Sequence, residues 1–434
     1  MIKKLAIEGG KRSFLSGEIP VDQHQFREKD LERILEVLKS GRYSMFNNQT
    51  IRDFEDLIAN YLGVKKCSVL TNCTSALDAS FRALDIKEGD EIIMPAYTYA
   101  ATMMAILSAG AKPIFVDIDY DTLTLNPKLI EEKLTHSTKA IVPVHIFGNP
   151  CEVGSIMQIA KRYSLRVIED CAHSLSAKYN GKMTGSFDIG CHSFGENKIL
   201  RIGEGGAVTS DDEEFINRVE IIRHEGEVWA RKNISASYGI ELKLSDLTQG
   251  IDYVMRGHNF RYSPILAALG ISKFDTLNEQ ITAMNNNARV YNENLRESLE
   301  LRIPTEFHKS ERIYSSYIVL VESDHFDRNT LLLALAMEGV PVGIHFPKPL
   351  HKTRIYNTFS NDHNFPNSER FCNNHLALPV YPNVSAECVT KICDVVNYVI
   401  NELEKKSDKT INRFKQLFDK TIVKHFYSGV YVTV

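Results

Sequence analysis

A single lysine, Lys198, stands between two segments that could enclose it. Ser193 begins the first segment, and the glycine-rich turn Gly203-Glu-Gly-Gly206 ends the second, just before Ala207-Val-Thr209, which is typical of a short strand. A lysine in a partly desolvated pocket loses its proton readily and becomes a nucleophilic amine, which can form a Schiff base with an aldehyde cofactor. Most lysines are instead solvated surface residues, so Lys198 needs partners elsewhere in the chain before this chemistry can be assigned to it.

Pyridoxal 5′-phosphate is the common aldehyde cofactor, and it needs two further kinds of group. Asp170 ends the apolar segment 166–170 and is the candidate carboxylate for the pyridine nitrogen, because an opposite charge keeps that nitrogen protonated. Thr74 and Ser75 open a predicted helix, where free N–H groups and the helix dipole suit a phosphate. The alternative for all three residues is a plain helix N-cap.

Three more residues have suitable positions for the same cofactor. Ser193 could offer its hydroxyl to the phosphate, Tyr97 follows a predicted strand and could stack on the pyridine ring, and His173 could lie beside that ring or beside Asp170. A buried core tyrosine and an ordinary helix histidine are the competing interpretations. Each signal is weak alone, but their joint order along the chain favours one site.

These residues must be positioned by a sheet, and the chain predicts one. From residue 65 to residue 170, short apolar segments alternate with helical ones; the apolar segments are 67–70, 91–94, 113–117, 140–145 and 166–170. Such alternation indicates βαβ units and a mostly parallel sheet covered on both faces. Ligands bind outside the carboxyl ends of such strands, which is where the candidate residues lie.

Length and composition limit the possible classes of protein. The 434 residues favour two domains, and the net charge of −4 gives no reason to expect nucleic acid or an anionic membrane as a partner. No apolar run is long enough to cross a bilayer and the start does not resemble a signal peptide, so a cytoplasmic protein is expected. The eight cysteines are scattered without a CxxC pair, which predicts reduced thiols and no metal site.

The composition of the chain changes near residues 275–300. We expect an N-terminal arm and a large domain over 1–275, a smaller C-terminal domain over 276–405, and an extension of unassigned role over 406–434. The extension combines a charged helix with an apolar end, Tyr427 to Val434.

Several motifs together resemble the DegT/DnrJ/StrS sugar aminotransferase family. They are Thr71 to Leu77, Pro95-Ala-Tyr-Thr-Tyr99, Pro143-Val-His-Ile-Phe-Gly148, Glu169-Asp-Cys-Ala-His173, Ser193 to Lys198 with the glycine-rich turn, and Gly257 to Ser263. The resemblance implies fold type I: an α/β large domain with a mostly parallel seven-stranded sheet covered by helices, followed by a smaller α+β domain.

The resemblance also implies roles for particular residues. Lys198 would hold pyridoxal phosphate covalently, Asp170 would pair with its ring nitrogen beside His173, and Tyr97 would stack on the ring. The phosphate would be bound by Thr74, Ser75 and Ser193, and, from the neighbouring subunit of a homodimer, by Asn259 or Arg261. Cys73 departs from the glycine that is frequent in this phosphate turn.

The expected reaction is transfer of an amino group from glutamate or glutamine to a keto sugar, which we expect to be nucleotide-linked. Lys198 would then act as the general base. His345, Lys348 and His351 follow a predicted strand in the smaller domain and are candidates for contact with the sugar, with ordinary surface or core roles as the alternative. The variable region 225–256 leaves the acceptor undetermined.

Other functions remain open at this point. An aminotransferase for a ketocyclitol or a benzoate precursor differs only in its acceptor, and a keto-sugar dehydratase resembles members in which histidine replaces the lysine. A nicotinamide-dependent oxidoreductase would need a G-x-G-x-x-G after the first strand, which this chain lacks. A non-catalytic regulator would not need Lys198 and Asp170.

Overall fold

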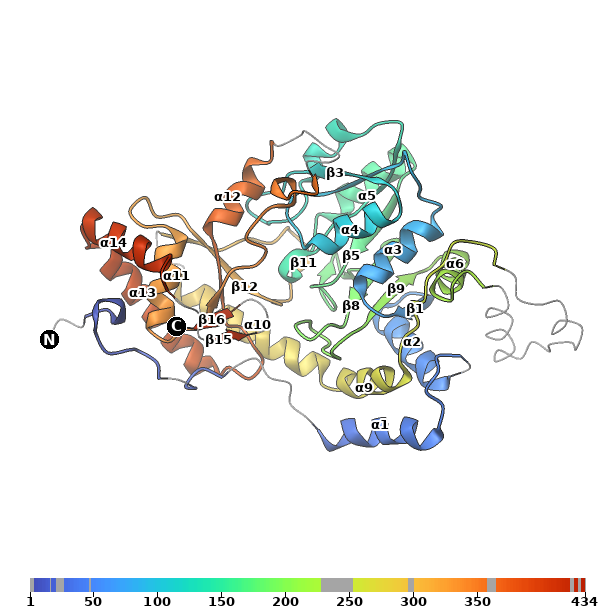
Figure 1. The fold of residues 1–434 in the computed structure, drawn as a ribbon, viewed down its shortest axis with the longest axis horizontal. Helices are drawn as coiled ribbons and strands as arrows, with labels where there is room; N and C mark the ends of the chain where they lie inside the picture. The colour runs from blue at the N-terminus through green and yellow to red at the C-terminus, as the bar shows by residue number, and fades with distance from the viewer. Residues whose placement is uncertain are drawn as a thin grey trace, which may run out of the picture.

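The computed structural model describes residues 4–15, 17–20, 27–46, 48–227, 253–295, 300–356, 364–421, 425–427 and 431–433. Most of the variable region predicted over 225–256 therefore lies outside the described residues. Figure 1 shows two layered units, joined along the long helix α10 (Leu277–Asn294).

The first unit is built on a seven-stranded sheet, as predicted. Its strand order is β1-β9-β8-β5-β4-β2-β3. The strands are β1 (Lys66–Leu70), β2 (Glu91–Pro95), β3 (Lys112–Val116), β4 (Thr138–Ile141), β5 (Arg166–Asp170), β8 (Ile189–Ser193) and β9 (Gly206–Ser210). Only β9 runs against its neighbours β1 and β8, and the other pairs are parallel. The mostly parallel sheet is thus confirmed.

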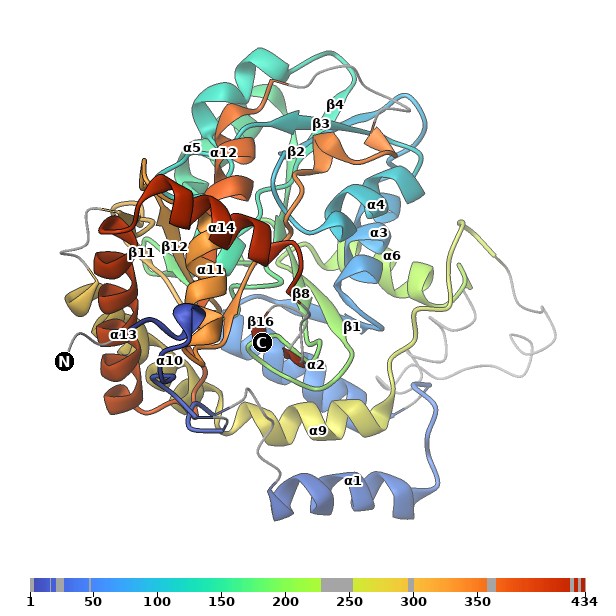
Figure 2. The same ribbon diagram turned by 60° about the vertical axis from the view of Figure 1, so that its left-hand side comes forward.

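Helices cover both faces of this sheet because successive strand residues point to opposite sides. In β2, Ile92 and Met94 pack with α3 (Cys73–Ala83), α4 (Ala100–Ser108) and α6 (Glu213–Arg223), whereas Ile93 packs on the other face with α5 (Val153–Tyr163). That second face is also covered by α2 (Gln49–Leu62) and α9 (Pro264–Phe274). Helix α1 (Glu28–Ser40) packs outside α9 (Figure 2).

The second unit has a six-stranded sheet with the order β10-β12-β14-β13-β16-β15. Its strands are β10 (Leu301–Arg302), β12 (Tyr317–Val321), β13 (Val342–Gly343), β14 (His375–Leu378), β15 (His425–Tyr427) and β16 (Tyr431–Thr433). Its helices are α11 (Arg328–Met337), α12 (Pro366–Asn374), α13 (Ala386–Glu404) and α14 (Asp408–Phe418). The extension after residue 405 therefore adds a helix and two strands to this unit.

The predicted boundary at residue 275 can be compared with the helices on either side of it. Helix α9 packs on α1 and α2, whereas α10 packs on α13, so position 275 falls between two helices with different neighbours. The N-terminal arm, which the sequence grouped with the large domain, packs against the second unit: Leu5 and Phe14 join its core cluster, and the N–H of Ala6 donates to Glu338 at 2.8 Å.

Some local predictions differ from the structure. Between β3 and β4, where alternation of strands and helices predicts a helix, the chain forms two short 3-10 turns, η2 (Pro127–Leu129) and η3 (Glu131–Lys133). The strand predicted before Lys348 in the smaller domain is β13, which has only two residues. An extra three-stranded sheet joins β11 (Ser310–Glu311), β6 (Lys178–Tyr179) and β7 (Lys182–Met183). All eight cysteines are free and seven are buried. Among the described residues, no helix is both long and apolar enough to span a membrane.

Candidate active site

Lys198 lies in the loop between β8 and β9, half-buried at the carboxyl end of the large sheet. Burial lowers the pKa of Lys198, and the charges of Cys73 and Asp170 oppose that shift. The amine of Lys198 therefore loses its proton more readily than the amine of a solvated lysine. The nucleophile that forms a Schiff base must be deprotonated. Its backbone carbonyl accepts a hydrogen bond from Arg201 at 2.9 Å, which fixes the loop.

Asp170 is the last residue of β5 and is 5% exposed. One carboxylate oxygen accepts from the hydroxyl of Thr102 at 2.8 Å, and the other accepts from the N–H of Ala172 at 3.1 Å. Burial raises the pKa of Asp170, while these two donors and the charge of Lys198 oppose the rise. Such a carboxylate fits a protonated ring nitrogen, which would supply the missing counter-charge. Thr102 lies on α4, and no sequence pattern pointed to it.

His173 lies close enough to Lys198 for the lysine charge to affect it. Burial lowers the pKa of His173 well below its usual value, with further contributions from the charges of Lys198 and His345. Its Nδ1 accepts from the N–H of Phe147 at 3.3 Å. The ring lies nearly parallel to those of Phe147 and Phe346, with centroids 6.0 and 6.3 Å away. His173 is thus held in place by these contacts, in surroundings that favour its neutral form.

The amino end of α3 carries two of the residues predicted to bind phosphate, Thr74 and Ser75. Asn72 is the N-cap and accepts from the N–H of Ser75 at 2.8 Å, and the Ser75 hydroxyl bonds to Thr71 at 2.8 Å. Thr74 is exposed at this end. Orphan N–H groups of the first turn together with these hydroxyls suit an anion.

Strand β9 brings Ser193 to the same corner. Gly206 pairs with Ser193 of β8 on one side and with Leu70 of β1 on the other. A Cβ on Gly206 would lie 2.3 Å from the carbonyl carbon of Asn72, so only glycine lets β9 pass this close to the start of α3. The residues predicted to bind phosphate are therefore brought together by the tertiary structure.

Tyr97 lies in the core and does not present a free ring face. It is 1% exposed, its hydroxyl donates to the carbonyl of His345 at 2.8 Å, and its ring meets Phe371 edge-on with centroids 4.5 Å apart. This placement favours the alternative interpretation of Tyr97 as a core residue. Tyr99, two residues later, is 58% exposed and lies beside Phe346 at 5.3 Å between centroids.

The three candidate sugar contacts lie in different environments. His345 is 8% exposed, its Nε2 has no hydrogen-bond partner among the described residues, and burial lowers its pKa to about 3, helped by the charges of His375 and Lys198. Lys348 is exposed. His351 is fully buried and its Nε2 pairs with Glu369 at 2.9 Å. The structure therefore brings His345, but not His351, toward Lys198.

Asn259 and Arg261 lie on a segment beside α6. Asn259 is exposed and forms a single bridge with His224. Arg261 pairs with Glu225 at 2.9 Å and lies over the ring of Phe46 at 5.5 Å. Arg261 thus already has partners in its own subunit.

A buried hydrogen-bond network underlies Asp170. Glu169 accepts from the N–H groups of Gly185 and Phe187, both at 2.9 Å, and its Oε2 lies 3.0 Å from Nε2 of His145. Nδ1 of His145 accepts from the N–H of Cys151 at 3.0 Å. No metal site was predicted from the sequence. In the structure, however, the ligand atoms of His145, Glu169 and Cys171 lie within 4.8 Å of one another. These hydrogen bonds fix the end of β5, and with it the position of Asp170.

Lys198, the buried carboxylate of Asp170 and the start of α3 lie together at the carboxyl ends of parallel strands. These groups supply an amine, a counter-charge and an anion site. Together they define a pyridoxal phosphate enzyme of fold type I. The residues present fit that cofactor. Residues 24–397 match the DegT/DnrJ/EryC1/StrS aminotransferase family, and the chain belongs to this family. It is therefore a pyridoxal phosphate-dependent aminotransferase, as the sequence predicted.

Similar proteins support this assignment along nearly their whole length. The chain is 34% identical to dTDP-3-amino-3,6-dideoxy-alpha-D-galactopyranose transaminase from Aneurinibacillus thermoaerophilus, over 85% of this chain and 95% of that protein. Its structure resembles DesI solved with its TDP-sugar product (TM-score 0.80, 26% identity, 96% of this chain and 100% of that chain). It also resembles the PLP form of Spr1654 from Streptococcus pneumoniae (TM-score 0.78, 25% identity, 89% and 99%).

Proposed function

We propose that this protein transfers an amino group from glutamate or glutamine to a keto sugar linked to a nucleotide. The observation that carries the proposal is the placement of Lys198, the buried Asp170 and the start of α3 together at the carboxyl ends of the parallel strands. The similarity to a dTDP-sugar transaminase, and to a protein solved with a TDP-sugar product, supports a nucleotide-linked acceptor.

Each residue of the site has a definite task in this proposal. Lys198 holds the cofactor and, once displaced, moves the proton on the α-carbon of the amino donor, for which its lowered pKa is suited. Asp170 holds the ring nitrogen protonated, and Thr74, Ser75 and Ser193 bind the phosphate. When bound, pyridoxal phosphate supplies the electron sink that makes this proton removable.

The exposed aromatic residue at the site is Tyr99, and we propose that its ring, in place of Tyr97, covers one face of the cofactor. Tyr97 then acts indirectly, because its hydrogen bond to the carbonyl of His345 holds that residue in place. His345 has a buried nitrogen without a described partner, so a hydroxyl of the sugar could satisfy it. Lys348 stays a candidate for contact with the sugar.

Two further expectations belong to the proposal. The active form is a homodimer in which Asn259 or Arg261 of one subunit reaches the phosphate bound by the other. The protein works in the cytoplasm, where nucleotide-linked sugars are made available.

The test is the visible absorption of the purified protein with cofactor, before and after hydride reduction. The wild type should show a band that reduction bleaches, and the reduced cofactor should stay attached to the denatured chain, because hydride converts the imine into a stable amine. Lys198→Ala should show no such attachment and should lose at least roughly 10³-fold in transamination rate. Lys128→Ala, at an exposed lysine on η2, is the control and should behave as the wild type. A Lys198→Ala variant whose cofactor stayed covalently attached after reduction would refute the assignment.

The acceptor is tested in the reverse direction with dTDP-3-amino-3,6-dideoxy-α-D-galactose as amino donor, alongside its GDP- and UDP-linked counterparts. Bleaching of the band by at least one of these, with release of a keto sugar, is the expected result. A product that had lost a hydroxyl without exchanging an amine would indicate the dehydratase instead.

A further inference from the structure

The segment from residue 406 onward lies outside the part of the chain that matches the family, which ends at residue 397. It nevertheless contributes α14, β15 and β16 to the second unit. Its helix makes apolar and charged contacts with that unit, and its two strands extend the sheet of that unit.

Helix α14 is anchored in the core of the second unit. Ile411 and Phe414, one helical turn apart, are 2% and 3% exposed and belong to the same core cluster as the apolar residues of α11. Just before the helix, the carbonyl of Lys406 bonds to His325 at 2.8 Å and its ammonium pairs with Glu8 at 2.9 Å. Burying two large side chains is enough to hold the helix in place.

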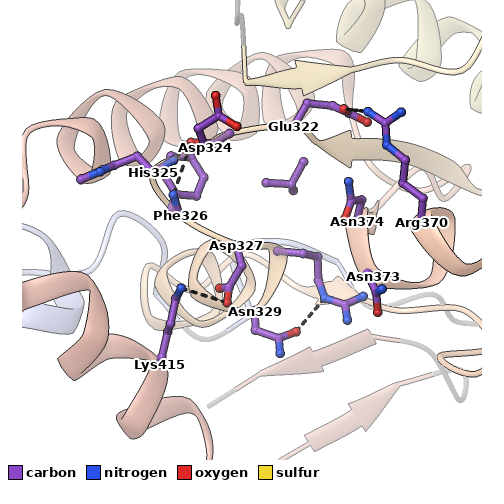
Figure 3. Close-up of a pocket in the computed structure, with 13 residues that line it drawn as sticks. Glu322, Asp324, His325, Phe326, Asp327, Asn329, Arg370, Asn373, Asn374 and Lys415 are labelled. Carbon is purple, nitrogen blue, oxygen red and sulfur yellow. Dashed lines mark hydrogen bonds and ion pairs between the residues drawn. The ribbon is translucent and has the colours of Figure 1, made fainter. Parts of the chain in front are cut away.

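The same helix closes one wall of a polar pocket of about 520 Å³ (Figure 3). Lys415 of α14 faces Asp327 at the start of α11, 3.5 Å away, and Glu322 pairs with Arg370 across the opposite wall. These two ion pairs lie within the lining of the pocket, and the pair of Lys415 with Asp327 links α14 to the start of α11. A ligand would have to displace these ion pairs. We therefore interpret the pocket as a structural contact between α14 and α11, not as a binding site.

Beyond the helix, the chain returns to the sheet. Val432 and Tyr431 of β16 pair with Val342 and Gly343 of β13 in antiparallel register, and β15 pairs with the far side of β16. Among the described strands, β13 would be the edge of the second sheet without these two. An edge strand of two residues with one neighbour is weakly held, and pairing on both sides holds it more firmly.

Strand β13 leads directly into the site. His345 follows it by two residues and couples to Lys198, and the ring of Phe346 lies over His173 and beside Tyr99. The segment is tied down again at Leu350, whose N–H donates to the carbonyl of Ala96 at 3.0 Å. Between these two attachment points, the segment 344–350 forms one side of the site around Lys198.

We propose that β16 is a brace that positions the segment 344–350 against the sugar acceptor. The inference rests on the proposed function, because it assigns the sugar to this side of the site. Loss of the brace should therefore impair reaction with the amino sugar far more than reaction with glutamate, whose transamination needs chiefly Lys198 and Asp170. A displacement of the order of 1 Å at a substrate contact can cost a factor of roughly 10² in rate.

The test compares Val432→Pro with Val432→Thr, in the full chain with cofactor. Proline removes the backbone N–H and cannot continue a central strand, whereas threonine keeps the N–H and the β-branched shape. A third variant that stops after Lys420 removes β15 and β16 and keeps α14. Hydrogen exchange of the peptide 342–346 reports the pairing, independently of activity.

We expect faster hydrogen exchange at 342–346 in Val432→Pro and in the shortened variant. Both should also react roughly tenfold or more slowly with the amino sugar. The amino sugar is dTDP-3-amino-3,6-dideoxy-α-D-galactose, or whichever counterpart reacts fastest with the wild type. The rate of these two variants with glutamate should stay within roughly twofold, and Val432→Thr should behave as the wild type. Unchanged exchange, or equal loss in both half-reactions, would overturn the brace. Absence of the visible band in the wild type would instead remove the proposed function, while the exchange result would still decide the strand pairing.

Discussion

At the scale of single residues, Asp170 is a group that is costly to keep charged before the cofactor binds. Its carboxylate is buried, its pKa is raised, and its donors are Thr102 and Ala172. A carboxyl group whose folded pKa is above its unfolded value of about 3.9 stabilises the fold below that pH. This contribution is lost as the pH rises through the raised folded pKa.

This gives a prediction for the cofactor-free protein. Its thermal stability, followed by circular dichroism from about pH 4 to pH 8, should fall more steeply in the wild type than in Asp170→Asn, because the amide does not titrate. Thr102→Val should steepen the wild-type fall, since a buried carboxylate then loses one donor, at a cost of about 1–3 kcal/mol. Parallel curves for the wild type and Asp170→Asn would show that Asp170 keeps its ordinary pKa.

At the scale of elements, the site depends on how closely β9 passes the start of α3. Ser193, Thr74 and Ser75 come from different elements, and Gly206 is the position at which β9 lies against the backbone of Asn72. A side chain here would push the strand away from the helix and open the phosphate corner.

We therefore predict that Gly206→Ala lowers the free energy of unfolding by about 1–3 kcal/mol and weakens cofactor binding. Gly195→Ala is the matched control, because its added Cβ would have only ordinary contacts at 3.7 Å with Ser193 and Lys198. Urea unfolding should place the control within about 0.5 kcal/mol of the wild type. Equal stability of the two variants would mean that β9 can move without loss.

At the scale of the whole molecule, the proposed dimer makes each site depend on two chains. Lys198 and Asn259 of one chain would then serve different sites. Mixed dimers of Lys198→Ala and Asn259→Ala would contain one site with both substitutions and one site with neither.

Mixing these two inactive variants after mild dissociation should thus restore activity, to at most about one quarter of the wild type for random pairing. The control is a chain that carries both substitutions, mixed with Lys198→Ala, which should stay inactive. Sedimentation should show dimers throughout. No recovery among mixed dimers would place Asn259 in the site of its own subunit.

The chemistry of this protein could be predicted from short segments of its sequence. Lys198, Asp170 and the start of α3 each follow a strand of recognisable pattern, and parallel strands bring their carboxyl ends to one edge whatever the details of packing. The order of strands and helices therefore already implied that these residues meet.

Other features depended on contacts between distant parts of the chain. Tyr97 and Tyr99 are two residues apart, and only the pairing of Tyr97 with His345, 248 residues away, makes one a core residue and leaves the other exposed. His351 is buried and paired with Glu369, and β16 could be placed only by its pairing with β13. Local patterns fix residue chemistry and strand order, whereas burial and edge pairing are decided by whichever distant surface covers a residue.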